Sequence, residues 1–416
     1  MITNEYYYSI LDYSKAHFEA DQAHNKHREQ ISQLDFLRDT HACIIGEKGI
    51  GKTVLARQKV LALVDGDLSK ALYVSLDDSL FADQSMFDIA QAADQRGVNF
   101  IIFDEVHRYP EWKTNLKMII DRLKIKTVAS GSSILSFKDL GGLSRRTIKF
   151  ELLGLSFREY INLVYPVSFT GLTLEDLTTG KQDLANLKQQ IESSINVPIL
   201  ALFEDYLQRG YYTYSLEQRD LSGFLTTLRQ ASEDTISYEI VIAQTHTRPD
   251  MSRKLQALFK AVAQNVPYTL DYKFLKEYAQ IPDLRTLKHY LASLQNAGMI
   301  YALERKTIKS LRKPEKLYLG NTCLYFAYSN LKPNIGSLRE TFFVTTLRLA
   351  GLDPYIHQGN ADFICGNYSF EIGGANKNKK QIKGIKNSYV VKDVAEVPSD
   401  PEVVPLWAFG FLKNSF

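Results

Sequence analysis

The chain has 416 residues, more than one ordinary hydrophobic core accommodates, so we expect roughly two to four domains. Its 45% hydrophobic and 23% charged residues are typical of a globular protein, and a net charge of +3 does not demand a nucleic-acid partner. Three scattered cysteines (Cys43, Cys323 and Cys365) exclude a disulfide framework, and no run of about 18 apolar residues would cross a membrane, so we expect a cytoplasmic protein.

The first 38 residues look helical and polar, and they lead into alternating strands and helices over residues 39–153. The predicted strands cover residues 42–45, 71–76, 100–103, 125–130 and 147–152. A helix predicted over residues 54–64 has Arg57, Gln58 and Lys59 on its solvent side. Strands that alternate with helices predict an α/β fold with a parallel sheet covered on both faces.

Residues 46–53 match the phosphate-binding loop pattern G-x-x-x-x-G-K-[ST] at every fixed position. The glycines let the backbone turn tightly and direct its N–H groups at phosphate oxygens, Lys52 would reach the β- and γ-phosphates, and the Thr53 hydroxyl would contact Mg²⁺. A strand before the loop and a helix after it favour this interpretation, because a helix N-terminus attracts an anion. The predicted ATP-binding residues are Gly46, Glu47, Lys48, Gly49, Ile50, Gly51, Lys52, Thr53 and Val54.

The third predicted strand ends in two acidic residues, Asp104 and Glu105, after four apolar residues. This is the Walker B pattern, because a strand buried on both faces is apolar throughout and its carboxyl end is where α/β sheets bind ligands. We expect Asp104 to hold the Mg²⁺ shell together with Thr53, and Glu105 to polarise the attacking water.

Two further elements of the first half carry polar side chains that would serve the nucleotide. Ser130 ends the fourth strand, where its hydroxyl would contact the γ-phosphate or the attacking water, or else cap the following helix. Arg145 and Arg146 precede the fifth strand, and we expect one of them, Arg145 slightly favoured, to reach the nucleotide of a neighbouring copy in a homo-oligomer. The alternative is a solvated pair of arginines at a strand start.

The second half begins with a long helical region, residues 154–250, which we expect to form a lid or insertion. Residues 251–329 then show three helices and a hairpin with a basic connection, an arrangement typical of a winged helix. Its third helix would expose Arg285, Lys288 and His289 toward DNA. The alternative is a packing module that never meets DNA, in which case the partner is a protein.

The tail, residues 330–416, contains a helix with Glu340 in its first turn and two strands joined by a turn at 366–367. This register places Asp362 opposite Glu371 on one face of the hairpin. Like charges directly opposite destabilise a sheet unless they bind a cation, or did so in an ancestor. Glu340, Asp362 and Glu371 are therefore the candidate residues of a vestigial metal site.

The chain resembles the AAA-type P-loop ATPases of bacteria and archaea that carry a C-terminal PD-(D/E)xK nuclease-like domain. The resemblance rests on G-E-K-G-I-G-K-T at 46–53, F-D-E-V-H-R-Y-P-E-W at 103–112, A-S-G-S-S at 129–133, L-S-R-R at 143–146, G-L-S-F-R-E-Y at 154–160, Y-L-Q-R-G at 206–210, K-L-Y-L-G-N-T at 316–322, A-D-F at 361–363 and F-E-I-G-G at 370–374. It implies an AAA-like sheet, a helical lid, a winged helix and a nuclease-like tail. One position departs from the nuclease pattern: Gly373 stands where a lysine is expected, so Lys377 or Lys383 would have to replace it.

The expected function is a Mg²⁺-dependent ATPase that acts as a switch or motor on DNA or on a protein partner. One alternative is an ATP-gated DNA nuclease that uses the C-terminal domain, and another is a nucleotide-binding sensor or scaffold that hydrolyses slowly. Glu105 argues against a scaffold that does not hydrolyse, and Gly373 argues against the nuclease.

Overall fold

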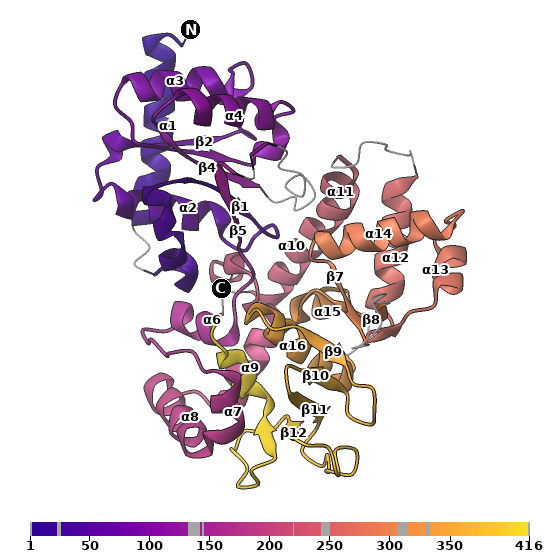
Figure 1. Ribbon diagram of the computed structural model, residues 1–416. Helices are drawn as coiled ribbons and strands as arrows, with labels where there is room; N and C mark the ends of the chain where they lie inside the picture. The colour runs from indigo at the N-terminus through magenta and orange to yellow at the C-terminus, as the bar shows by residue number, and fades with distance from the viewer. Residues whose placement is uncertain are drawn as a thin grey trace. The chain divides into compact units, whose positions relative to one another are not determined.

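The computed structural model divides the chain into two compact units, residues 1–153 and residues 154–416 (Figure 1). The residues that it describes are 2–22, 26–131, 142–143, 145–218, 220–242, 250–305, 314–328 and 333–414. Each unit has its own sheet or sheets, and each is described by itself below.

Unit 1 is built on a parallel five-stranded sheet with the strand order β2-β3-β4-β1-β5. The strands are β1 (His41–Ile45), β2 (Ala71–Ser75), β3 (Phe100–Asp104), β4 (Lys126–Gly131) and β5 (Thr147–Glu151). The predicted α/β fold with a parallel sheet is confirmed, and every strand lies within two residues of its predicted bounds. Because β1 lies between β4 and β5, the loop that follows it leaves from the interior of the sheet.

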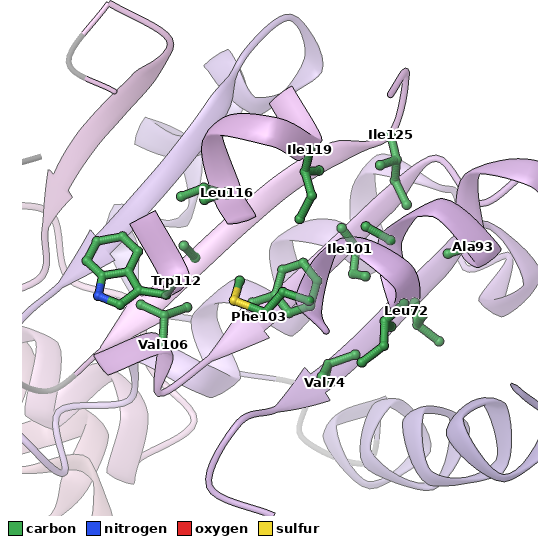
Figure 2. Close-up of a cluster of buried hydrophobic side chains, with 14 of the residues drawn as sticks. Leu72, Val74, Ala93, Ile101, Phe103, Val106, Trp112, Leu116, Ile119 and Ile125 are labelled. Atoms are coloured by element: carbon green, nitrogen blue, oxygen red, sulfur yellow. The ribbon is translucent and has the colours of Figure 1, made fainter. Parts of the chain in front are cut away.

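Helices cover both faces of this sheet. They are α1 (Asn4–Gln22), α2 (Lys52–Leu63), α3 (Met86–Gln95) and α4 (Trp112–Arg122), with 3-10 helices at Glu29–Arg38, Leu68–Lys70, Ser79–Phe81 and Val106–Arg108. On one face, α3 and α4 enclose a core in which Val74, Phe103 and Leu116 are fully buried (Figure 2). On the other face, α2 packs against β1, β3 and β4, and α1 packs against β2 and α2.

The prediction that Arg57, Gln58 and Lys59 face solvent is wrong. All three side chains are buried, at 6–8% exposure, because α1 and the Glu29–Arg38 helix cover the outer side of α2. Two of these buried side chains form ion pairs: Arg57 pairs with Asp21 of α1, and Lys59 pairs with Asp35. The segment before β1 is therefore an integral layer of unit 1.

Unit 2 begins with a helical region. Its helices are α6 (Phe157–Val164), α7 (Leu174–Thr179), α8 (Lys181–Ile195), α9 (Ile199–Asp205), α10 (Leu221–Asp234) and α11 (Ile240–Ile242), with π-helices at Tyr206–Gly210 and Thr235–Glu239 and a 3-10 helix at Thr213–Leu216. In the described part of the chain, no helix has the length and apolar character needed to span a membrane.

The middle of unit 2 combines helices with a small antiparallel sheet in the order β6-β8-β7. In chain order the elements are α12 (Met251–Ala263), β6 (Tyr268–Thr269), α13 (Tyr272–Tyr278), α14 (Leu284–Asn296), β7 (Ile300–Glu304), β8 (Pro314–Leu319) and α15 (Thr322–Tyr328). The three helices and the hairpin expected from the sequence are present. Most of the basic connection lies in residues 306–313, outside the described residues.

The end of unit 2 is a five-stranded mixed sheet in the order β13-β12-β11-β10-β9. Its elements are α16 (Ile335–Leu349), β9 (Pro354–Ile356), β10 (Phe363–Cys365), β11 (Tyr368–Gly373), β12 (Ser388–Lys392), β13 (Val403–Pro405) and a 3-10 helix at Leu406–Phe411. The hairpin register is as predicted, since Cys365 pairs with Tyr368. Strands β11, β12 and β13 are parallel, and α16 packs on β11.

Candidate active site

The loop between β1 and α2 has a backbone that only glycine supplies without strain. Gly49 and Gly51 have φ angles of 83° and 91°, in the left-handed region. At Gly46 a Cβ atom would lie 2.3 Å from the main-chain oxygen of Leu152, which cannot move aside as a side chain can. The three glycines therefore fix a tight loop at the N-terminus of α2, where backbone N–H groups gather.

Lys52 and Thr53 begin α2, so both side chains start from this N-terminus. The Lys52 ammonium donates to the main-chain oxygen of Glu47 in its own loop, at 2.7 Å, and the side chain is buried. The Thr53 hydroxyl donates to the Oδ2 atom of Asp104 at 2.7 Å. The loop and the end of β3 are thus joined by a direct side-chain contact.

Asp104 is buried, with 3% of the residue exposed. Its Oδ2 atom accepts from Thr53 and, at 3.0 Å, from the Tyr73 hydroxyl. Its Oδ1 atom accepts from the Ser130 hydroxyl and from the main-chain nitrogen of Glu105 at 3.1 Å. All of these donors are uncharged, so the negative charge of Asp104 is oriented but not neutralised by them.

Glu105 follows β3 in an uncommon backbone conformation, with φ 51° and ψ 41°. Left-handed conformations of residues other than glycine cost of order 1 kcal/mol and concentrate at functional sites. Its Oε2 atom lies 3.2 Å from the Nδ1 atom of the buried His107, and its side chain is 26% exposed. Glu105 is therefore next to Asp104 in sequence but keeps access to solvent.

Ser130 is the residue before the last of β4, and its hydroxyl contacts Asp104. The alternative role as a helix cap involves residues 132–141, which lie outside the described residues. The two arginines before β5 differ clearly. Arg146 donates to Asp121 at 2.6 Å and to the main-chain oxygen of Gly142 at 2.7 Å, whereas Arg145 is exposed. Arg145 is thus the more exposed of the two arginines.

Sequence reasoning missed Arg28, which lies between α1 and the Glu29–Arg38 helix and is buried. Its guanidinium donates to the main-chain oxygen of Ile50 in the phosphate loop at 2.6 Å, and to that of Leu153 at 2.9 Å. The neighbouring Leu152 donates its N–H to Ile45 at 2.8 Å. The loop is therefore braced by the segment that leads out of unit 1, a contact for which no sequence motif exists.

Sequence reasoning also missed Tyr73, which lies in the interior of β2 and reads as one more apolar strand residue. Burial and the nearby Asp104 carboxylate raise the pKa of Tyr73 above its usual value, so its hydroxyl keeps its proton and acts as a donor. Only the tertiary fold brings this hydroxyl to Asp104, because β2 and β3 are neighbours in the sheet.

Unit 2 contains a second acidic cluster, made of Glu340, Asp362 and Glu371. Burial is the main cause that raises the pKa of Glu340 and of Glu371 above their usual values, and the charge of Asp362 raises both further. Each carboxyl has a protein partner: Tyr318 donates to Glu340 at 2.8 Å, the main-chain nitrogen of Ile372 donates to Asp362 at 2.8 Å, and Lys377 pairs with the fully buried Glu371.

The side chain of Lys377 occupies the space next to Gly373 where a larger residue would place its side chain. A Cβ atom on Gly373 would lie 2.6–2.7 Å from the Cβ, Cγ and Cδ atoms of Lys377, whose ammonium contacts Glu371. Lys377, and not Lys383, thus brings a cation to the acid that precedes Gly373 by two residues. Among the described residues, no group of three or more His, Cys, Asp or Glu side chains is arranged to hold a metal ion.

The candidate DNA-facing residues lie together on α14, where Arg285, Lys288 and His289 are all exposed. Leu284, the first residue of α14, is 45% exposed. The neighbouring α13 exposes Phe274 and Tyr278, whose rings lie 5.6 Å apart at 23°. These two neighbouring helices therefore expose basic and aromatic side chains.

Comparison with known proteins finds a family match for one segment of unit 1 and the start of unit 2. Residues 38–161 match the family described as "AAA domain" (AAA_14). The matched segment includes the phosphate loop, Asp104, Glu105 and Ser130. An uncharacterized protein from Methanocaldococcus jannaschii is 26% identical over 186 residues, which is 43% of this chain and 39% of that protein. Residues 38–161 are thus similar to an AAA-type domain, and the chain aligns with less than half of this curated relative.

Solved structures show only distant likeness. AMPPCP-bound DnaA from Aquifex aeolicus is 13% identical with a TM-score of 0.29, over 64% of this chain and 85% of that one. A Thermotoga maritima RuvB variant is 16% identical with a TM-score of 0.30, over 72% and 90%. The Saccharomyces cerevisiae Hsp104–ADP complex is 17% identical with a TM-score of 0.31, over 65% and 38%. At TM-scores this low, the likeness carries no argument about function.

Proposed function

We propose that this chain is a Mg²⁺-dependent ATPase that acts as a switch or motor on DNA or on a protein partner. The observation that carries the proposal is Asp104, an oriented carboxylate bonded to Thr53 at the N-terminus of α2, directly after a glycine-shaped loop. The donor set fits Mg²⁺, which takes oxygen ligands and is held by one or two protein oxygens together with phosphates. Mg²⁺ bound there would offset phosphate charge.

The roles of the protein groups follow from where each lies. Backbone N–H groups of the loop would bind the phosphates, and Lys52 would exchange its contact with Glu47 for phosphate oxygens. Thr53 and Asp104 would hold the metal ion. Glu105, partly exposed beside Asp104, would accept the proton of the attacking water. Arg145, free of the contacts that hold Arg146, would reach the nucleotide of a neighbouring copy.

The test is ATP turnover of the full chain with Mg²⁺ against that of Lys52→Ala and Glu105→Gln. We expect Lys52→Ala to lose nucleotide binding or hydrolysis. Glu105→Gln should bind ATP but turn over at least about 10²-fold more slowly, as expected for a lost general base. A Glu105→Gln variant that hydrolyses at the wild-type rate would show that this role is wrong.

The partner is addressed by the same assay with single- and double-stranded DNA added. We propose that residues 251–329 form a winged helix and that Arg285 and Lys288 contact DNA phosphates, supported by their exposure on α14. DNA binding should then weaken steeply with salt, since phosphate contacts release counterions. If DNA does not stimulate turnover and Arg285→Ala,Lys288→Ala binds DNA as wild type does, the partner is a protein.

We further propose that residues 330–416 form a nuclease-like domain that no longer cuts DNA. The ion pair between Lys377 and Glu371 supports this proposal, because the buried acid already has a cation. The test is incubation with linear, nicked and branched DNA, with Mg²⁺ or Mn²⁺ and with or without ATP. Cleavage that Asp362→Ala and Glu371→Ala abolish, but Lys52→Ala retains, would establish the alternative of an active nuclease.

A further inference from the structure

We propose that Tyr73, held in place by Asp21 and Arg57, is a positioning residue for Asp104 that sets how tightly the nucleotide site binds Mg²⁺. The proposal rests on the ATPase function proposed above and adds residues that no sequence motif includes. Asp21 belongs to α1, which lies before residue 38, where the family match begins. The N-terminal helix would thus contribute to metal binding through two other side chains.

The first step is the contact between Tyr73 and Asp104. Ser75 pairs with Asp104 across β2 and β3, and alternate residues of a strand face the same side of a sheet, so Tyr73 and Asp104 share a face. The Tyr73 hydroxyl donates to Oδ2 at 3.0 Å, the same atom that accepts from Thr53. The phenol therefore fixes the carboxylate from the side of β2, independently of the phosphate loop.

The second step is that the Tyr73 ring has little freedom to move. It is 4% exposed, and its ring lies nearly parallel to that of Tyr13, with centroids 6.1 Å apart and an interplanar angle of 3°. The guanidinium of Arg57, which belongs to α2, lies 4.7 Å from the centroid of the Tyr73 ring. The main-chain nitrogen of Tyr73 donates to the hydroxyl of Ser14, which belongs to α1, at 2.9 Å. A ring packed by two helices places its hydroxyl at one point.

The third step concerns the charge of Arg57. Its guanidinium donates to Asp21 through Nε at 2.5 Å and Nη2 at 2.9 Å, and both side chains are buried. This bidentate pair ties the guanidinium to α1. Burial lowers the pKa of Arg57, the pair with Asp21 raises it, and the charge of Asp104 is a smaller influence that also raises it. Without Asp21, a buried and unpaired cation would be left near the carboxylate, where it would compete with a metal ion.

Removing a group that orients a metal-binding side chain lowers the metal affinity about 10–100-fold. We therefore expect Tyr73→Phe, which deletes one oxygen and keeps the ring, to raise the half-saturating Mg²⁺ concentration about 10-fold. Asp21→Asn should shift it in the same direction, because it frees Arg57. Neither change touches the loop, so binding of ADP without metal should be unaffected.

The experiment is a Mg²⁺ titration of ADP binding to the full chain by calorimetry, with a parallel measurement in EDTA. The matched control is Tyr13→Phe, which removes a hydroxyl from the same ring stack, on the side of Asp78 and Ser75. We expect Tyr73→Phe, but not Tyr13→Phe, to need more Mg²⁺ than wild type for half-saturation. The ADP affinity measured in EDTA should be the same in both variants and in wild type.

Two results would overturn this inference while leaving the ATPase proposal intact. One is a Tyr73→Phe titration equal to wild type, and the other is an equal loss of ADP affinity with Mg²⁺ and in EDTA, which is the signature of a packing role. Failure of the wild-type chain to bind ADP with Mg²⁺ would overturn the ATPase proposal, and this inference with it. Tyr73→Phe keeps the test decisive even if Asp21→Asn does not fold.

Discussion

The Asp104 site of unit 1 and the Glu371 cluster of unit 2 are both buried acidic sites beside a sheet, but they are built in opposite ways. Asp104 ends β3, is surrounded by uncharged donors, and contacts Thr53 next to a loop that the Arg28 side chain braces. Glu371 is paired with the flexible Lys377, which fills the space beside Gly373. In the proposed function the first site receives a cation from solution, whereas the second already holds the Lys377 ammonium of the chain itself.

The largest test of this difference compares the two glycines. We expect Gly46→Ala to cost up to about 3 kcal/mol of unfolding free energy and to weaken nucleotide binding, because its Cβ would meet the main chain of Leu152. At Gly373→Ala the new methyl would meet the Cβ, Cγ and Cδ atoms of Lys377 at 2.6–2.7 Å, so Lys377 must shift and its ion pair with Glu371 weakens. We expect this change to cost about 2 kcal/mol of unfolding free energy but to leave nucleotide binding unchanged. Denaturant unfolding and nucleotide titration of both variants measure these effects. An equal loss of nucleotide binding in Gly373→Ala would contradict the distinction between the two sites.

A second test removes the built-in cation. Lys377→Met should lower the unfolding free energy by about 2 kcal/mol, less than for a fully buried pair because Lys377 is 27% exposed. Adding Glu371→Gln should restore most of that loss, since no buried charge is then left unpaired. The double variant is the control. If Lys377→Met is as stable as wild type, the ion pair does not compensate the buried acid.

The smallest effect is expected from Glu340→Gln, which tests the cost of burying carboxyls in unit 2. Burial raises the pKa of Glu340 above its usual 4.5, so the folded protein holds this proton more tightly than the unfolded chain does. Ionisation therefore destabilises the fold as the pH rises above 4.5 and through the folded pKa. Glu340→Gln should have a higher Tm than wild type at pH 7, and this gain should disappear below pH 4.5. The exposed Glu204→Gln should show no such gain.

Sequence reasoning succeeded where residue roles are local. The phosphate loop and the end of β3 are each a short continuous segment, and alternating strands and helices allow few arrangements other than a parallel sheet. The register of the β10–β11 hairpin followed from the length of its turn. These features depend on neighbours in the chain, which a sequence displays directly.

What could not be predicted depends on contacts between distant segments. Arg57 looked exposed because a helix pattern shows which side packs on the sheet but not that α1 covers the other side. Arg28 is 22 residues from its partner in the phosphate loop, and nothing in its sequence neighbourhood marks it. The choice of Lys377 over Lys383 required the path of the chain after β11. In each case the residue is recognised only from its three-dimensional neighbours, which the sequence does not display.

The layer formed by α1 and the segment up to residue 38 separates two definitions of a domain. As an evolutionary unit, the matched family begins at residue 38. As a folding unit, the same domain begins at α1, because Ser14, Asp21 and Arg28 bond to β2, α2 and the phosphate loop. A fragment trimmed to the family boundaries would expose the buried Arg57 and release Ile50 from its brace. We expect such a fragment to be a poor substitute for the intact unit in any recombinant or inhibitor-screening use.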